Sequence, residues 1–100
     1  QEFDIIYKNI KGFKIPVESV VEKNNKLGVY VINEENNIPE FVGLGKNYYK
    51  DAKYYYVDYN KNKDENKLNL YDRILLYPNF INKSKQVTLI NEYKIKYRKN

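Results

Sequence analysis

The chain has 100 residues, the size of one ordinary domain, and a net charge of +5. It contains no cysteine and no histidine, which excludes disulfide bonds, thiolate chemistry and the commonest zinc ligands, and removes the usual general base at neutral pH. It contains no methionine, so we expect it to be a piece of a longer protein, and it has no apolar run of about 18 residues that could span a membrane.

The first half of the sequence predicts short strands separated by turns. Val, Ile and Tyr fit a pleated sheet, and the single alanine, Ala52, argues against helices. Pro16 cannot donate to a ladder, so we expect it at a strand start or a sheet edge. Gly43 and Gly45 flank Leu44 and predict a bulge or a sharp bend. The expected strands cover residues 3–7, 13–15, 19–22, 28–32 and 38–44, with turns at 23–26 and 33–37.

The second half begins with the strongest strand pattern of the chain, over residues 52–59. Strand alternation places Tyr55 and Val57 on one face and Tyr54 and Tyr56 on the other. Residues 61–67 are charged and carry no apolar side chain, which predicts an exposed, mobile loop. Further strands are expected at 73–77, stopped by a proline, and at 86–97, with a kink near Asn91.

Together these elements predict an all-β fold. We expect a small barrel-like or sandwich sheet of about seven short, mainly antiparallel strands, because strand signals recur at the spacing typical of such folds. Residues 1–100 are expected to form a single domain. The predicted core residues are Val20, Val29, Val31, Val57, Ile74 and Leu76.

The sequence offers no constellation that predicts catalysis. The carboxylates are Asp51, Asp58, Asp64, Glu65 and Asp72, and no pair of them stands apart from ordinary surface acids. Residues 64–66 lack the spacing and the glycine of a calcium loop, and residues 43–46 lack the spacing of a phosphate loop. We therefore expect no enzymatic activity, no cofactor and no metal site.

Nucleic acid is the main alternative partner. The stretch from Asn47 to Lys61 interleaves tyrosines with lysines, and stacked aromatics on a basic strand bind single-stranded nucleic acid in small barrels. Tyr54 and Tyr56 would be the stacking platforms. The lysines are spread along the whole chain and form no patch, which favours packing roles for the tyrosines and argues against this partner.

The order of several short motifs resembles the C-terminal segment of membrane fusion proteins, the HlyD-like periplasmic adaptors of efflux and secretion systems, in the form found in clostridium-type Gram-positive bacteria. The matching blocks are Ile15-Pro16, Ser19-Val20-Val21, Gly28-Val29-Tyr30-Val31, Phe41-Val42, Asp72-Arg73-Ile74-Leu75 and residues 81–87. The family commonly has glycine at two positions where this chain has Tyr71 and Ser84.

The resemblance implies a membrane-proximal β domain without catalytic residues or a cofactor. Such a domain couples a membrane transporter to an export assembly, so the implied partners are a transporter and other adaptor subunits, with the membrane surface as a further contact. The implied location is extracytoplasmic, with membrane association through parts absent from this chain. A generic cell-surface binding domain is a third interpretation. The candidate partner contacts lie in the predicted turns 23–26 and 33–37 and in the loop stretch 46–51: Lys23, Asn25, Lys26, Asn36, Lys46, Tyr48 and Tyr49.

Overall fold

A computed structural model describes residues 12–58, 68–80, 83 and 92–97. This part of the chain is all-β, as the sequence predicts, with two antiparallel sheets. The strands are β1 (Gly12–Pro16), β2 (Val21–Lys23), β3 (Lys26–Ile32), β4 (Pro39–Gly43), β5 (Tyr48–Lys50), β6 (Tyr54–Asp58), β7 (Arg73–Leu75), β8 (Glu92–Lys94) and β9 (Lys96–Tyr97). Two short 3-10 turns, η1 (Val17–Ser19) and η2 (Pro78–Phe80), complete the elements.

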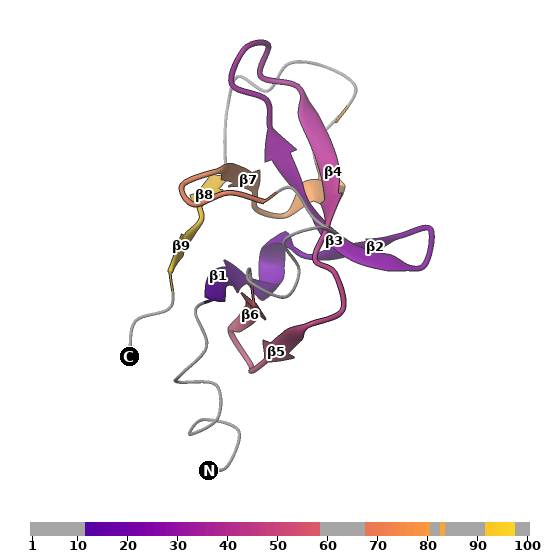
Figure 1. The fold of residues 1–100 in the computed structure, drawn as a ribbon. Helices are drawn as coiled ribbons and strands as arrows, with labels where there is room; N and C mark the ends of the chain where they lie inside the picture. Colours follow the sequence, from indigo (N-terminus) through magenta and orange to yellow (C-terminus); the bar gives the residue numbers. More distant parts are fainter. Residues whose placement is uncertain (1–11, 59–67, 81–82, 84–91, 98–100) are drawn as a thin grey trace.

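The first sheet, sheet A, has the strand order β5-β6-β1-β9. Alternation along β1 and β6 buries Phe13, Ile15, Tyr55 and Val57 on the inner face. The second sheet, sheet B, contains the path β2-β3-β7-β8, and β4 pairs with β3. Figure 1 shows the β2–β3 hairpin projecting to one side of the molecule, the β3–β4 turn at the top, and β5 and β6 below them.

The main core lies between the two sheets. Its buried residues come from both: Phe13, Ile15, Tyr55 and Val57 from sheet A, Val29 and Ile74 from sheet B, and Leu44, Leu68 and Ile95 from connecting segments. A second, smaller cluster lies on the opposite face of sheet B and contains Tyr30, Ile32 and Leu75. Sheet B therefore buries apolar side chains on both faces, which explains why its strands carry nearly continuous apolar runs.

The structure corrects several strand boundaries. The expected strand at 19–22 starts later, because residues 17–19 form η1, and Ser19 is fully buried in that turn. Strand β5 lies within a segment expected to be a loop, where it forms a hairpin with β6. The expected strand at 86–97 is divided at Ile95, where the chain passes from β8 in sheet B to β9 in sheet A. The expected strand at 3–7, the loop at 61–67 and the kink at Asn91 lie outside the described residues.

Of the six predicted core residues, three are fully buried and three are partly buried. Val29, Val57 and Ile74 are fully buried, and Val20 and Val31 are partly buried against the main core. Leu76 is only half-buried, whereas Leu75 has no exposed surface. The prediction omits Leu75 because alternation allows for one buried face, whereas β7 packs apolar clusters on both faces and buries the adjacent residues Ile74 and Leu75.

Pro16 lies at the end of β1, a strand inside sheet A, and not at a strand start or on an edge strand. The Val17 N–H donates to the Lys53 carbonyl at 3.0 Å. In an antiparallel ladder, residues that bond to a given partner strand alternate with residues that point away from it. Because Val17 bonds on the β6 side, the nitrogen of the preceding residue, Pro16, points away from β6. On that side β9 pairs only as far as Lys14. The proline therefore removes no hydrogen bond from the described ladder.

Candidate partner-contact groove

One groove of about 810 Å³ brings together four of the seven residues that the sequence selects as partner contacts. These four are Asn25, Lys26, Lys46 and Tyr48. The other lining residues are Leu27, Phe41, Gly43 and Gly45. The groove thus lies where the β2–β3 hairpin, the end of β4 and the start of β5 meet. We name it the hairpin groove.

The β2–β3 turn positions Asn25 and Lys26 at the groove. Lys23 pairs directly with Lys26, which leaves the two-residue loop Asn24-Asn25. Asn24 has φ of 53° and Asn25 has φ of 65°, and a hairpin loop with two left-handed residues is the type I′ turn. Asparagine tolerates this conformation better than most residues do, so the Asn-Asn pair is the local cause of the tight hairpin.

A glycine on β3 allows Phe41 to lie flat against the sheet at the groove. Gly28 pairs with Gly43 across β3 and β4. A Cβ atom on Gly28 would lie 2.5 Å from Cζ of Phe41 and 2.5 Å from the Val42 carbonyl oxygen. Lys23, the remaining candidate on the hairpin, places its Nζ 5.5 Å from the centre of the Phe41 ring. It therefore lies beside the groove without lining it.

Tyr48 lines the groove and packs against the core residue Tyr55. Its ring meets the Tyr55 ring edge-on, with centroids 5.5 Å apart, and it remains 41% exposed. Lys50 places Nζ 5.8 Å from the centre of the Tyr55 ring. Burial, together with the nearby Tyr48 hydroxyl, raises the pKa of Tyr55 above its ordinary value. Tyr48 therefore covers part of the core and also presents an accessible aromatic surface.

The groove is positively charged. Lys26 and Lys46 are exposed, and neither forms an ion pair within the described part of the chain. None of the groove-lining residues is acidic. The contrast is Arg73, which pairs with Glu34 and Glu92 at 3.3 Å each. The groove therefore combines uncompensated cations with the apolar surface of two aromatic rings.

The last two candidates lie away from the groove. Asn36 belongs to the β3–β4 turn, where its N–H donates to Asn33 Oδ1 at 3.2 Å and its Oδ1 accepts from the Ile38 N–H at 2.9 Å. This turn precedes β4, whereas the groove lies at the other end of that strand. Tyr49 lies on the outer face of sheet A, where its ring stacks on Tyr56 with centroids 5.9 Å apart.

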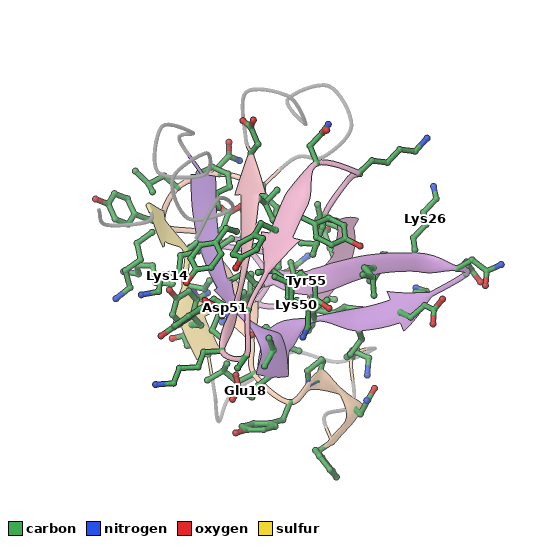
Figure 2. The ribbon with its side chains drawn as sticks, turned by 90° about the horizontal axis from the view of Figure 1, so that it is seen from below. Lys14, Glu18, Lys26, Lys50, Asp51 and Tyr55 are labelled. Atoms are coloured by element: carbon green, nitrogen blue, oxygen red, sulfur yellow. The ribbon has the colours of Figure 1, made fainter. Side chains whose placement is uncertain are left out.

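The outer face of sheet A is a second aromatic surface. Lys14 Nζ lies 4.2 Å from the centre of the Tyr54 ring, and the Tyr54 and Tyr56 centroids are 6.1 Å apart. In Figure 2, Lys14 and Asp51 lie on one side of the view and Lys26 projects from the hairpin on the other. The outer face and the hairpin groove are therefore separate surfaces.

Asp51 orders the β5–β6 turn beside this outer face. Its Oδ1 accepts the N–H groups of Lys53 and Tyr54 at 2.8 Å, and its Oδ2 accepts the Tyr56 hydroxyl at 2.9 Å. Burial alone would raise the pKa of Asp51. The hydrogen bonds and the positive charge of Lys14 outweigh burial, and the net result is a pKa below its usual value of 3.8.

Among residues 12–58, 68–80, 83 and 92–97, no group of three or more Asp and Glu side chains could hold a metal ion. The same ranges include no helix with the length and apolar character needed to cross a bilayer.

Comparison with known proteins gives no relative. No family model matches the chain, and neither the curated proteins nor the solved structures include a detectable match.

Sequence reasoning did not select Leu27, Phe41, Gly43 and Gly45 as groove residues. Each belongs to or adjoins a predicted strand, where an apolar side chain or a glycine is normally explained by packing. A usable signal was present in the pairing: a hairpin that opposes Gly28 with Gly43 leaves room for a large neighbouring side chain and for close approach of another backbone.

Proposed function

We propose that this chain is a non-catalytic docking domain of an extracytoplasmic adaptor protein, of the membrane fusion protein type, which couples a membrane transporter to an efflux or secretion assembly. The blocks that resemble the family fall on successive elements: the end of β1, the entry to β2, then β3, β4 and β7. This order along the strands of one fold supports the proposal, although β5 and β6 carry no matching block and the block at 81–87 lies, except for Lys83, outside the described residues.

The observation that carries the proposal is the backbone conformation of Tyr71. The adaptor family commonly has glycine at this position, immediately before the aspartate. Tyr71 has φ of 69°, in the left-handed region that glycine adopts without cost and that a bulky side chain rarely adopts. Two hydrogen bonds hold this segment: the Tyr71 N–H donates to the Ile95 carbonyl at 2.7 Å and the Ile95 N–H to the Asp72 carbonyl at 2.8 Å. The backbone thus keeps a glycine-type bend although the residue is tyrosine.

The hairpin groove is the docking surface in this proposal. It offers exposed cations and aromatic rings at a loop-rich end of a rigid sandwich, which is where binding residues are commonly found. Docking requires no catalytic group, in keeping with a surface whose polar members are lysines, an asparagine and a tyrosine.

Photo-crosslinking in the full-length protein, in its own cells, tests the proposal. A benzophenone side chain at Asn25, Lys46 or Tyr48 should give adducts to an integral membrane protein, and one at Asn36, at the far end of β4, serves as the matched control. Adducts of equal yield from all four positions would remove the groove from the proposal. Adducts exclusively to cytoplasmic proteins would contradict both the location and the function.

A second function is favoured by one observation, the alignment of Tyr49, Tyr54 and Tyr56 with Lys14 on the outer face of sheet A, which resembles a stacking platform for single-stranded nucleic acid. The geometry also weakens it, because two of these rings lie against each other and Lys14 lies over the third. We expect no submicromolar binding of mixed-sequence oligonucleotides in fluorescence anisotropy at physiological salt. Tight binding that is lost in Tyr54→Ala would establish this second function instead.

A further inference from the structure

The hairpin groove lies between two strand edges, one from each sheet. Phe41 and Gly43 belong to β4, which pairs only with β3 among the described strands. Tyr48 belongs to β5, which pairs only with β6 in the same part of the chain. Residues 44–47 connect the two edges, with a left-handed bend at Gly45, whose φ is 80°.

The hydrogen-bond register shows which backbone groups of β4 point away from β3. In an antiparallel ladder, residues alternate between those that bond to the partner strand and those that point away from it. The Leu44 N–H donates to the Leu27 carbonyl at 2.9 Å, and at the other end the Asn33 N–H donates to the Ile38 carbonyl at 3.0 Å. With Gly28 opposite Gly43, the N–H and C=O groups of Phe41 and Gly43 point away from β3.

The same reasoning applies to β5. The Asp58 N–H donates to the Asn47 carbonyl at 3.1 Å, and the Asp51 N–H donates to the Tyr54 carbonyl at 2.9 Å. The backbone groups of Asn47, Tyr49 and Asp51 therefore face β6, and those of Tyr48 face outward. Phe41, Gly43 and Tyr48, whose backbone groups point away from their partner strands, are all among the residues that line the groove.

We propose that the hairpin groove is a strand-addition site that takes an extended, acidic segment of the partner protein, paired with the outer edge of β4. This inference rests on the proposed docking function and specifies its ligand. Backbone groups of Phe41 and Gly43 supply the main-chain hydrogen bonds of such a complex, and side-chain pockets select alternate residues of the added strand. The rings of Phe41 and Tyr48 contact its apolar side chains.

The charge of the groove selects an acidic segment. Lys26 and Lys46 both line the groove, no acidic residue lines it, and Lys23 lies next to Phe41. Carboxylates on alternate residues of an added strand would face these ammonium groups. A basic segment would meet repulsion, so the lysines also discriminate between partners.

Amide hydrogen exchange in the 100-residue chain tests this inference, with a hexapeptide of alternating Glu and Val, acetylated and amidated, as the probe. In the unbound protein, the amides of Phe41, Gly43 and Tyr48 should exchange quickly, whereas that of Leu44, already bonded to β3, should be protected. Saturating peptide should slow exchange at Phe41 and Gly43 by about tenfold or more. A peptide with Lys in place of Glu, and one with Pro in place of Val, should produce no protection.

Two variants separate the contributions of charge and backbone. K26Q/K46Q should weaken binding of the acidic peptide by about tenfold, the size expected for loss of two exposed ion pairs. K53Q/K94Q, which removes two exposed lysines outside the groove, should leave affinity unchanged. Gly43→Pro removes an outward N–H without removing a ladder bond to β3, and should abolish binding. If this variant does not fold, the exchange pattern of the unsubstituted chain still decides the question.

Binding without protection of Phe41 and Gly43 would overturn strand addition and leave only electrostatic contact. Absence of binding would mean that the lysines serve solely to keep these edges from pairing with other chains. Concentration-dependent dimerisation with protection of the same amides would make a second copy the occupant, which also refutes the proposal. Crosslinking to a membrane protein is a separate measurement, so the docking function can hold where strand addition fails.

Discussion

The same substitution at two glycines that face each other should have different effects on stability. Gly28 pairs with Gly43 across β3 and β4. A Cβ on Gly28 would meet Cζ of Phe41 and the carbonyl oxygen of Val42, each at 2.5 Å, whereas a Cβ on Gly43 would meet only the Leu27 carbonyl oxygen at 3.7 Å. The Phe41 ring can rotate away. The Val42 carbonyl cannot move as easily, because the β3–β4 ladder holds its strand.

We therefore expect Gly28→Ala to lower the free energy of unfolding by about 2–3 kcal/mol, the usual cost of overpacking a tight site. Gly43→Ala should change it by less than about 1 kcal/mol, with a gain from the reduced freedom of the unfolded chain. In a domain of this size the difference corresponds to roughly 10–20 °C in Tm. Urea and thermal unfolding followed by circular dichroism measure both quantities.

A double variant identifies the contact responsible for the loss. Combining Gly28→Ala with Phe41→Leu removes the clash with the ring but keeps the clash with the Val42 carbonyl. In the Phe41→Leu background, Gly28→Ala should therefore lower the free energy of unfolding by less than it does in the unsubstituted chain, but should still lower it. Equal stability of Gly28→Ala and Gly43→Ala would refute the reasoning, because it would mean that the close packing of β4 on β3 does not exist in solution.

Three other predictions concern single side chains. Leu75→Ala should lower the free energy of unfolding, measured with heat or urea, by about 3 kcal/mol, and Leu76→Ala should lower it by about 1 kcal/mol. The reason is that Leu75 has no exposed surface whereas Leu76 is half-buried. The reverse order would show that the two faces of β7 are exchanged. The Tyr93 hydroxyl is buried without a hydrogen-bond partner among the described residues, and burial, with a smaller effect of Tyr54, raises the pKa of Tyr93 to about 12. Tyr93→Phe should therefore raise stability by about 1 kcal/mol at pH 7. Since an unfolded tyrosine ionises near pH 10, the native chain should also lose stability between pH 10 and pH 12 more steeply than this variant does. Asp51 has a lowered pKa, so its contribution to stability is present above pH 3.8 and is lost as pH falls through the folded-state pKa. When the free energy of unfolding is measured against pH in acid, Asp51→Asn should lack this part of the pH dependence. An unchanged profile would contradict the role given to Asp51.

Local sequence patterns were sufficient for the fold class and for several elements. The Asn24-Asn25 pair, between two apolar runs, predicts the hairpin because asparagine tolerates the left-handed conformation that the turn requires. Alternation predicts the burial of Tyr55 and Val57 in β6. The same rule omits Leu75, because β7 is covered on both faces, and the strand expected to continue to residue 97 is interrupted at Ile95, where the chain changes sheet. Both facts depend on long-range packing, which a local pattern does not encode.

The groove was only partly predictable for the same reason. Turn composition selected Asn25, Lys26, Lys46 and Tyr48, and the structure brings them together. The sequence does not show that β4 and β5 leave their outer edges facing this space, because edge positions follow from the order of strands in a sheet. Asn36 has the same turn chemistry as Asn25, yet it lies at the other end of β4.

The arrangement of sheet A has a consequence for the kinetics of folding. Strand β1 pairs with β6 and also with β9, so Phe13 and Tyr97, from opposite ends of the described chain, are neighbours in one ladder. The β2–β3–β4 meander of sheet B, in contrast, consists of pairs close in sequence. During synthesis the meander can form as soon as residues 21–43 emerge, whereas sheet A needs residues 12–58 for its first three strands and is complete only after β9 has emerged. Since loop closure has to precede such distant pairing, we expect folding in the millisecond-to-second range, with protection appearing in sheet B before β1.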